Sequence, residues 1–293
     1  MVIIVLSGGI GAQLFQYAAG YSIAKKNNSR LILDCCWYSS GNEGVTKPLK
    51  LPEIINLKKE VLINNIWFSR LLRTIFKLIS IFSFGLISYK RIDIKNPVKL
   101  EKFPESSNYF INGYIYNFGY FNNYIHEITK KFNLEKKNNK KTQIGIHIRK
   151  GDQKDGIVDF CNADYYRRAV NKIIEKKKLN INNVELLVFC EELEWPKNNI
   201  ENNGMEIKFV IGDDKTAIRD LKIMMNCDHL VISNSAYSWW AAAYIYKNLD
   251  SMIVCPDLWW DRIDVKKINI YPKEWNILET KIEPNENPEY LNL

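Results

Sequence analysis

The sequence predicts an α/β protein in which helices alternate with the strands of parallel sheets. Short apolar runs of strand character are separated by stretches of helical length along most of the chain, and this order implies crossover connections. Loops rich in glycine, serine or asparagine follow several of the predicted strands. A chain of 293 residues, of which 46% are hydrophobic, is long enough for one large domain or two ordinary ones.

The first half predicts an N-terminal Rossmann-like domain over residues 1–140. It opens with a strand at 2–6, a glycine turn, a helix at 12–26 and a strand at 31–34. Residues 39–120 form an irregular middle segment in which we predict no element boundaries. A helix at 123–132 leads into residues 135–142, whose lysines and asparagines have the composition of a linker.

The second half predicts a C-terminal domain over residues 141–293. After a strand that begins at Gln143, helices are expected at 163–178, 216–226 and 237–246. Strands are expected at 184–190, 207–211, 229–233 and 252–255. This alternation implies a second parallel sheet.

The most informative stretch reads Gln-Ile-Gly-Ile-His-Ile-Arg-Lys-Gly-Asp, residues 143–152. Its period of two places three isoleucines on one face of a strand, and His147 and Arg149 on the other. The arginine is then delivered to the carboxyl end of a buried strand, where open α/β sheets bind their ligands. A guanidinium group at that place suits the oxygens of a phosphate or diphosphate. The alternative is an arginine that pairs with a nearby carboxylate.

Two further loops follow predicted strands. Residues 7–13, Ser-Gly-Gly-Ile-Gly-Ala-Gln, lack the third glycine of the dinucleotide fingerprint and the lysine of a P-loop, so alone they indicate a tight strand-to-helix turn. Residues 233–238, Ser-Asn-Ser-Ala-Tyr-Ser, precede a predicted helix. One short polar side chain is enough to cap a helix, and this loop offers four, which favours contact with an anion at the helix N-terminus.

Charge and composition restrict the classes of ligand. The net charge of +8 favours an anionic ligand or surface, but no basic patch is interleaved with aromatic residues, so nucleic acid is not expected. Six cysteines without a C-x-x-C pair and only three histidines argue against a disulfide framework and a zinc site. Because no basic leader precedes the first strand, we expect a cytoplasmic protein.

Residues 66–91 are apolar, with cations at Arg70, Arg73, Lys77, Lys90 and Arg91. The apolar run 78–89 is shorter than the roughly 20 residues that a membrane-spanning helix requires. Two interpretations remain. The segment is either a pair of core helices with charged flanks, or it lies on an anionic membrane surface with its apolar side down, which would place the protein peripherally at the inner face of the membrane.

Three motifs occur in the order and at the separations of one known family. They are Gly8-Gly9-Ile10-Gly11-x-Gln13-Leu14-Phe15-Gln16-Tyr17-Ala18, His147-Ile148-Arg149-Lys150-Gly151-Asp152 and Ser233-Asn234-Ser235-x-Tyr237-Ser238-Trp239-Trp240. In this combination the chain resembles the bacterial α-1,2-fucosyltransferases of glycosyltransferase family 11. The resemblance covers both ends and the whole second half, and is faint between residues 39 and 120.

The resemblance implies a GT-B-like fold, with two facing Rossmann-like domains that each contain a parallel sheet. The N-terminal domain would serve the acceptor and the C-terminal domain would bind a GDP-sugar. The implied reaction transfers L-fucose from GDP-fucose to a galactoside hydroxyl with inversion, forming an α-1,2 linkage in bacterial surface glycan synthesis. The acceptor would be a galactoside-terminated oligosaccharide or a lipid-linked glycan. Because no Asp-x-Asp triplet occurs in the chain, we expect no metal ion and no cofactor.

The resemblance also assigns roles to residues. Arg149 would clamp the diphosphate, His147 would lie beside the nucleotide, and Asp152 would orient the arginine or its loop; these are the predicted catalytic residues. A carboxylate at Glu191 or Glu192 would accept hydrogen bonds from the N1 and N2 donors of guanine. The predicted substrate-binding residues are Gly8, Gly9, Gly11, Gln13, His147, Arg149, Glu191, Glu192, Ser233, Asn234, Ser235 and Ser238.

The general base and the acceptor are less clearly indicated by the sequence than the donor site. Asp155 and Asp159 are candidates for the general base, but each is better explained as a solvated loop acid, so we assign the role to neither. Ala12 stands where the family usually has asparagine, and residues 113–116 read Gly-Tyr-Ile-Tyr where Gly-Tyr-Trp-Gln is usual. Two alternatives remain. Residues 66–91 favour a fucosyltransferase of different linkage that acts on a lipid-linked repeat unit, and Ala12 favours a nucleotide-sugar-binding protein without turnover.

Overall fold

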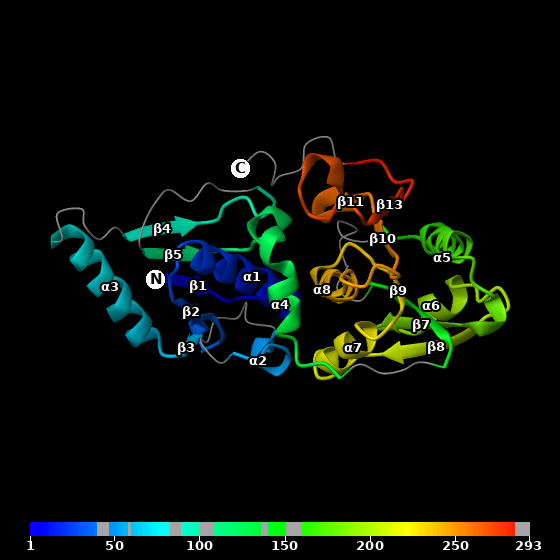
Figure 1. Cartoon of the computed structure of the whole chain (residues 1–293), viewed down its shortest axis with the longest axis horizontal. Helices are drawn as coiled ribbons and strands as arrows, with labels where there is room; N and C mark the ends of the chain where they lie inside the picture. The colour runs from blue at the N-terminus through cyan, green and yellow to red at the C-terminus, as the bar shows by residue number, and fades with distance from the viewer. Residues whose placement is uncertain are drawn as a thin grey trace. The chain divides into compact units, whose positions relative to one another are not determined.

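The computed structural model describes residues 1–39, 47–57, 60–82, 89–99, 108–135, 140–150 and 160–284. The chain forms two compact units, Met1–Asn133 and a second that begins at Leu134, and each unit has its own parallel sheet (Figure 1). The predicted α/β class is confirmed. The sequence predicts that the first domain ends at residue 140, within the stretch 135–142 that has the composition of a linker.

Unit 1 has a five-stranded parallel sheet in the order β3-β2-β1-β5-β4. Its strands are β1 (Val2–Val5), β2 (Leu31–Asp34), β3 (Val61–Ile63), β4 (Tyr89–Asp93) and β5 (Asn108–Asn112). Its helices are α1 (Ile10–Lys26), α2 (Leu51–Ile54), α3 (Ile66–Phe82) and α4 (Ile125–Lys130), with short 3-10 turns η1 (Cys36–Ser39), η2 (Phe118–Tyr120) and η3 (Asn122–Tyr124).

The two long helices of unit 1 differ in their burial. Every residue of α1 from Ile10 to Ala24 is buried, which identifies α1 as a core helix. Helix α3 connects β3 and β4, the two edge strands of the sheet, and only Ser69 on it is buried. The interpretation of this segment as core helices is therefore wrong for Ile66–Phe82. No helix in the described ranges is long and apolar enough to cross a membrane.

Unit 2 has a six-stranded parallel sheet in the order β13-β10-β9-β6-β7-β8. Its strands are β6 (Thr142–His147), β7 (Val184–Cys190), β8 (Glu206–Ile211), β9 (His229–Val231), β10 (Ile253–Pro256) and β13 (Asn276–Leu278), and β11 (Leu258–Trp259) forms an antiparallel pair with β12 (Ile263–Asp264). The helices are α5 (Ala163–Lys177), α6 (Glu194–Asn199), α7 (Ala217–Met224) and α8 (Ala236–Ile245), with 3-10 turns η4 (Ile181–Asn183), η5 (Trp260–Arg262) and η6 (Val265–Lys267).

The strand order of unit 2 defines where its loops can meet a ligand. Counted along the chain from β6, the six strands lie in the spatial order 3-2-1-4-5-6, which is the Rossmann arrangement. The winding direction reverses between β6 and β9. Ligands of open α/β sheets bind at the carboxyl ends of the strands at this reversal.

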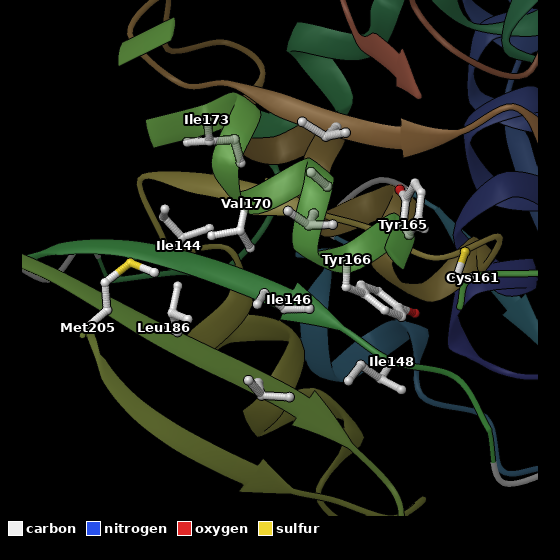
Figure 2. Packing of buried hydrophobic residues seen from close by; sticks show 14 of the residues in the cluster. Ile144, Ile146, Ile148, Cys161, Tyr165, Tyr166, Val170, Ile173, Leu186 and Met205 are labelled. Atoms are coloured by element: carbon white, nitrogen blue, oxygen red, sulfur yellow. The ribbon is translucent and has the colours of Figure 1, made fainter. Parts of the chain in front are cut away.

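Strand β6 carries different residues on its two faces, as its sequence pattern predicts. Ile144, Ile146 and Ile148 belong to one hydrophobic cluster on the side of α5, where Figure 2 shows Ile144 near Val170 and Ile148 near Tyr166. Gly145 points to the opposite face, where an added Cβ would lie 2.6 Å from Cδ2 of Leu230. His147 shares that opposite face by the same alternation.

Candidate functional site

Three loops of unit 2 follow adjacent strands at the carboxyl edge of the sheet. They come after β7, β6 and β9, and β6 lies between the other two. The backbone N–H of Ile148 donates to the carbonyl of Phe189 at 2.9 Å, so the pairing of β6 with β7 continues to the start of the loop. Residues from these three loops are therefore neighbours although they are far apart in sequence.

A buried hydrogen bond joins two of these loops across the reversal point. Nδ1 of His147 lies 2.8 Å from Oγ of Ser233, and both side chains are buried. Helix α5 holds both strand ends, because the Tyr166 hydroxyl donates to the carbonyl of His147 at 3.2 Å and the Tyr165 hydroxyl donates to that of Ile232 at 2.7 Å. The structure thus brings together two of the predicted site residues in a fixed arrangement.

Tyr237 completes the surroundings of His147 and is absent from the predicted site. Its ring centroid lies 5.5 Å from that of His147, and its hydroxyl donates to the carbonyl of Ala217 at 2.6 Å. Burial raises the pKa of Tyr237, and the charges of Asp220 and, to a lesser degree, Glu191 raise it further. The sequence signal for Tyr237 was its place in the first turn of the helix that follows the serine-rich loop.

The polar residues of the loop at 233–238 make local contacts. Ser235 caps α8 by accepting a hydrogen bond from the backbone N–H of Tyr237 at 3.3 Å. The hydroxyl of Ser238 donates to the carbonyl of Ser235 at 3.4 Å, and Oδ1 of Asn234 accepts from Sγ of Cys161 at 4.0 Å. Capping therefore explains Ser235. The first-turn amides of this ten-residue helix add partial positive charge at the same edge of the sheet.

Charged residues at this edge come from β6 and β7. Arg149 and Lys150 are half-buried directly after the strand, and Nζ of Lys150 lies 4.2 Å from the ring centroid of Trp195. Glu191 and Glu192 are exposed directly after β7. Among the residues that the structure describes, these two loops thus contribute two cations and two carboxylates.

One predicted site residue and both candidate bases follow Lys150 in the sequence. Asp152 lies outside the described residues, as do Asp155 and Asp159. In the described part of the chain, no three His, Cys, Asp or Glu side chains are grouped as metal ligands would be. The site is therefore defined by its described arginine, histidine, glutamates and serines.

The four predicted residues of the glycine loop, Gly8, Gly9, Gly11 and Gln13, belong to unit 1. Gly8 has a φ of +72°, in the left-handed region that favours glycine, and its carbonyl accepts a hydrogen bond from the Tyr38 hydroxyl at 2.8 Å. An added Cβ at Gly8 would lie 3.0 Å from Cε1 of Tyr114, which follows β5. The carboxyl ends of β1 and β5 thus bring the glycine loop and Tyr114 together.

Gln13 is fully buried, and its amide bonds to four backbone groups. Nε2 donates to the carbonyls of Gly8 and Pro48, both at 2.9 Å, and Oε1 accepts from the N–H groups of Lys50 and Leu51, both at 2.9 Å. The side chain therefore ties the segment before α2 to the glycine loop. In this structure Gln13 shapes unit 1 rather than presenting its amide to a ligand.

Known proteins share this fold. The structure of an Arabidopsis thaliana FUT1 variant in complex with GDP aligns with a TM-score of 0.52 at 12% identity, covering 86% of this chain and 69% of that one. Together with the two parallel sheets, this similarity places the chain in the GT-B-like class of α/β proteins with two Rossmann-like units.

Sequence comparison gives the family. A family model described as glycosyl transferase family 11 matches residues 50–279, and the chain belongs to that family. Relatives include an alpha-1,2-colitosyltransferase of Escherichia coli, 27% identical over 95% of this chain and 99% of that protein. The O-antigen biosynthesis glycosyltransferase WbnK, also of Escherichia coli, is 26% identical over 87% of this chain and 93% of that protein. The predicted family is thereby confirmed.

Proposed function

We propose that this protein transfers L-fucose from GDP-fucose to a galactoside hydroxyl, with inversion and without a metal ion, to form an α-1,2 linkage. Membership of family 11 supports glycosyl transfer. The linkage and the acceptor are supported by the names of relatives. These include the alpha-1,2-colitosyltransferase and the Homo sapiens galactoside alpha-(1,2)-fucosyltransferase 1, which is 24% identical over 35% of this chain and 28% of that protein.

The observation that carries the proposal is the His147–Ser233 hydrogen bond at the reversal point of a Rossmann sheet, with Arg149 two residues after His147. Cleavage of the bond between sugar and phosphate leaves negative charge on GDP. Donors that are fixed before the reaction stabilise that charge most effectively. Arg149 and the first-turn amides of α8 are among the described donors at this edge, and on this proposal they supply positive charge without a metal ion.

The remaining residues divide between donor and acceptor. Glu191 or Glu192 would accept from N1 and N2 of guanine, because a carboxylate matches two adjacent donors. In unit 1 the carboxyl ends of β1 and β5 place Tyr114 beside Gly8, and a half-exposed aromatic ring suits the apolar face of a sugar. On this proposal the Tyr114 side contacts the acceptor.

A second donor is favoured by the relative that is named a colitosyltransferase. Colitose is L-fucose without its 3-hydroxyl group, so one pocket can accept both sugars unless it hydrogen-bonds that hydroxyl. A site that hydrogen-bonds a hydroxyl discriminates strongly against the analogue that lacks it. The ratio of kcat/KM for GDP-fucose and GDP-colitose therefore identifies the natural donor.

The test measures GDP release by the full chain from GDP-fucose, GDP-colitose and GDP-mannose, each with a panel of β-galactosides and with and without EDTA. We expect turnover with one or both of the first two donors, no effect of EDTA, and an α-1,2 linkage in the product by NMR. Loss of activity on chelation would contradict metal independence. Donor binding without release of GDP across the whole panel would favour a binding protein, and another linkage would move the assignment to the lipid-linked alternative.

A further inference from the structure

Helix α3 presents an apolar face to solvent. Trp67, Leu71, Ile75, Leu78 and Phe82 recur at intervals of three or four residues, so they form one stripe, and Phe68 adjoins it. All six are exposed, Trp67 and Phe82 by more than 70%. An isolated exposed apolar side chain is ordinary, but a contiguous stripe along a whole helix marks an interaction surface.

A different face of α3 attaches it to unit 1. The Ser69 hydroxyl donates to a carboxylate oxygen of Asp34, Leu72 packs against the core cluster of the sheet, and the guanidinium carbon of Arg73 lies 4.8 Å from the ring centroid of Phe110. The N-terminus is capped by Asn65, whose Oδ1 accepts from the N–H of Trp67 at 2.9 Å. The helix is therefore formed and anchored, and the exposed stripe is not needed to hold it.

The charged side chains of α3 itself are all positive. No Asp or Glu occurs between residues 61 and 92 of the sequence, whereas five Lys or Arg residues do. Arg70 and Lys77, seven residues apart, lie on one side of the stripe. The guanidinium carbon of Arg70 lies 5.4 Å from the ring centroid of Trp67. Lys90 is exposed on β4, the strand that follows α3 in the chain. A partner that binds this surface must offer apolar groups to the stripe and negative charge to the cations beside it.

We propose that α3 docks parallel to the surface of an anionic lipid bilayer, with the stripe among the acyl chains and Arg70 and Lys77 at the headgroups. A helix of 17 residues is about 25 Å long, which suits a helix in the interface plane. A second copy of the chain fits less well, because pairing two stripes would bring like charges together without an acidic partner. This inference does not rest on the proposed reaction.

The test is co-sedimentation of the full chain with vesicles of equal parts phosphatidylglycerol and phosphatidylcholine, compared with pure phosphatidylcholine. We expect binding to the anionic vesicles that weakens with added salt. The variant Arg70→Gln/Lys77→Gln should bind about thirtyfold more weakly, and Leu71→Gln/Leu78→Gln should lose about tenfold or more. Addition of the anionic vesicles should change the tryptophan fluorescence of wild type. Comparison with Trp67→Phe then shows how much of this change comes from transfer of Trp67 to an apolar environment.

Matched controls separate the stripe from general charge and hydrophobicity. Lys266→Gln/Lys267→Gln removes two exposed lysines of unit 2, and Ile181→Gln/Leu249→Gln removes two exposed apolar side chains there. Both should bind vesicles like wild type, and circular dichroism should show that every variant is folded. Equal binding by the α3 variants and the controls would overturn the proposal. The opposite result would be no vesicle binding and a wild-type dimer in sedimentation velocity that becomes a monomer in Leu71→Gln/Leu78→Gln. It would show that the stripe binds a second copy of the chain instead.

Discussion

Arg149 is the residue on which the proposed transfer depends most. It lies two residues after the end of β6, and the buried contact between His147 and Ser233 fixes the end of that strand. A guanidinium group in this place acts on the departing diphosphate more strongly than on the intact donor, because the charge there increases as the bond breaks. Its loss should therefore lower turnover more than it raises KM.

We predict that Arg149→Ala lowers kcat by roughly 10²–10³-fold with GDP-fucose. Arg149→Lys should recover only part of this loss, because an ammonium group keeps the charge but not the two-pronged geometry. The measurement is steady-state GDP release. Arg167→Ala is the control, because Asp164 keeps its ion pairs with Arg168 and Lys281. Equal kcat for Arg149→Ala and wild type would remove the proposed mechanism.

Gln13 shows the limit of a motif at the scale of one residue. Its place beside the glycine loop predicts contact with substrate, but the structure shows its amide bonded to four backbone groups. Two of its partners, Lys50 and Leu51, lie far along the chain in a segment without a recognisable pattern. The sequence therefore could not reveal that this side chain had no hydrogen-bonding capacity to spare.

We predict that Gln13→Met, which keeps the volume and removes the hydrogen bonds, lowers the free energy of unfolding by about 2–4 kcal/mol. The loss arises because buried N–H and C=O groups are left without partners. Urea denaturation measures this loss. Gln143→Met is the control, because Gln143 is only half-buried and its side chain donates to Glu185, which keeps its ion pair with Lys208. An unchanged unfolding free energy together with a raised KM would show that Gln13 acts on substrate after all.

At the scale of elements, period and composition predicted unit 2 well. The expected strand at 184–190 is β7, and the expected helix at 163–178 is α5 within one residue. Helix α6 and strand β13 were missed, because they are short and have no periodic pattern. The middle of unit 1 was also missed. Strand β4 lies at a sheet edge with exposed residues, and α3 has a solvent-facing apolar stripe, so neither shows the usual pattern of burial.

The pairing of β9 with β10 gives a prediction about pH. Nδ1 of His229 accepts a hydrogen bond from the backbone N–H of Met252 at 3.0 Å, which requires the neutral ring. Burial lowers the pKa of His229 below its usual 6.5. As the pH falls, His229 therefore takes up a proton in the unfolded chain at a higher pH than in the folded chain. This stabilisation is complete above about pH 6.5 and is lost as the pH falls through the pKa of His229 in the folded chain.

We therefore expect that lowering the pH from about 7.5 to about 5.5 destabilises wild type more than His229→Asn, whose side-chain oxygen can accept the same hydrogen bond without titrating. Urea midpoints at the two pH values measure the difference. His126→Asn, at an exposed histidine, should behave like wild type. Parallel pH dependence of wild type and His229→Asn would exclude this role for His229.

At the scale of the whole molecule, unit 2 contains every described donor-side residue. Its sheet, its helices and its hydrophobic cluster lie within the chain from Leu134 onward. A unit with its own core can fold alone. On the proposed division of roles, the nucleotide site lies in unit 2, and Tyr114 on the acceptor side lies in unit 1.

We predict that a fragment of residues 134–293 folds and binds GDP, measured by calorimetry, but releases no GDP from GDP-fucose in the presence of a galactoside. A fragment of residues 1–133 should not bind GDP. The variant Arg149→Ala in the longer fragment should weaken binding. If the folded fragment fails to bind GDP while the full chain binds it, then unit 1 contributes to the nucleotide site.

The six cysteines have a practical consequence. All six are buried, and burial raises the pKa of Cys190 to about 11 and those of Cys35 and Cys36 to about 12. A maleimide reagent attacks an accessible thiolate, so the native chain offers it poor targets. One thiol introduced at the exposed Thr74 of α3 would thus carry a single dye without deletion of any natural cysteine. Spectroscopy could then follow this helix in the intact protein.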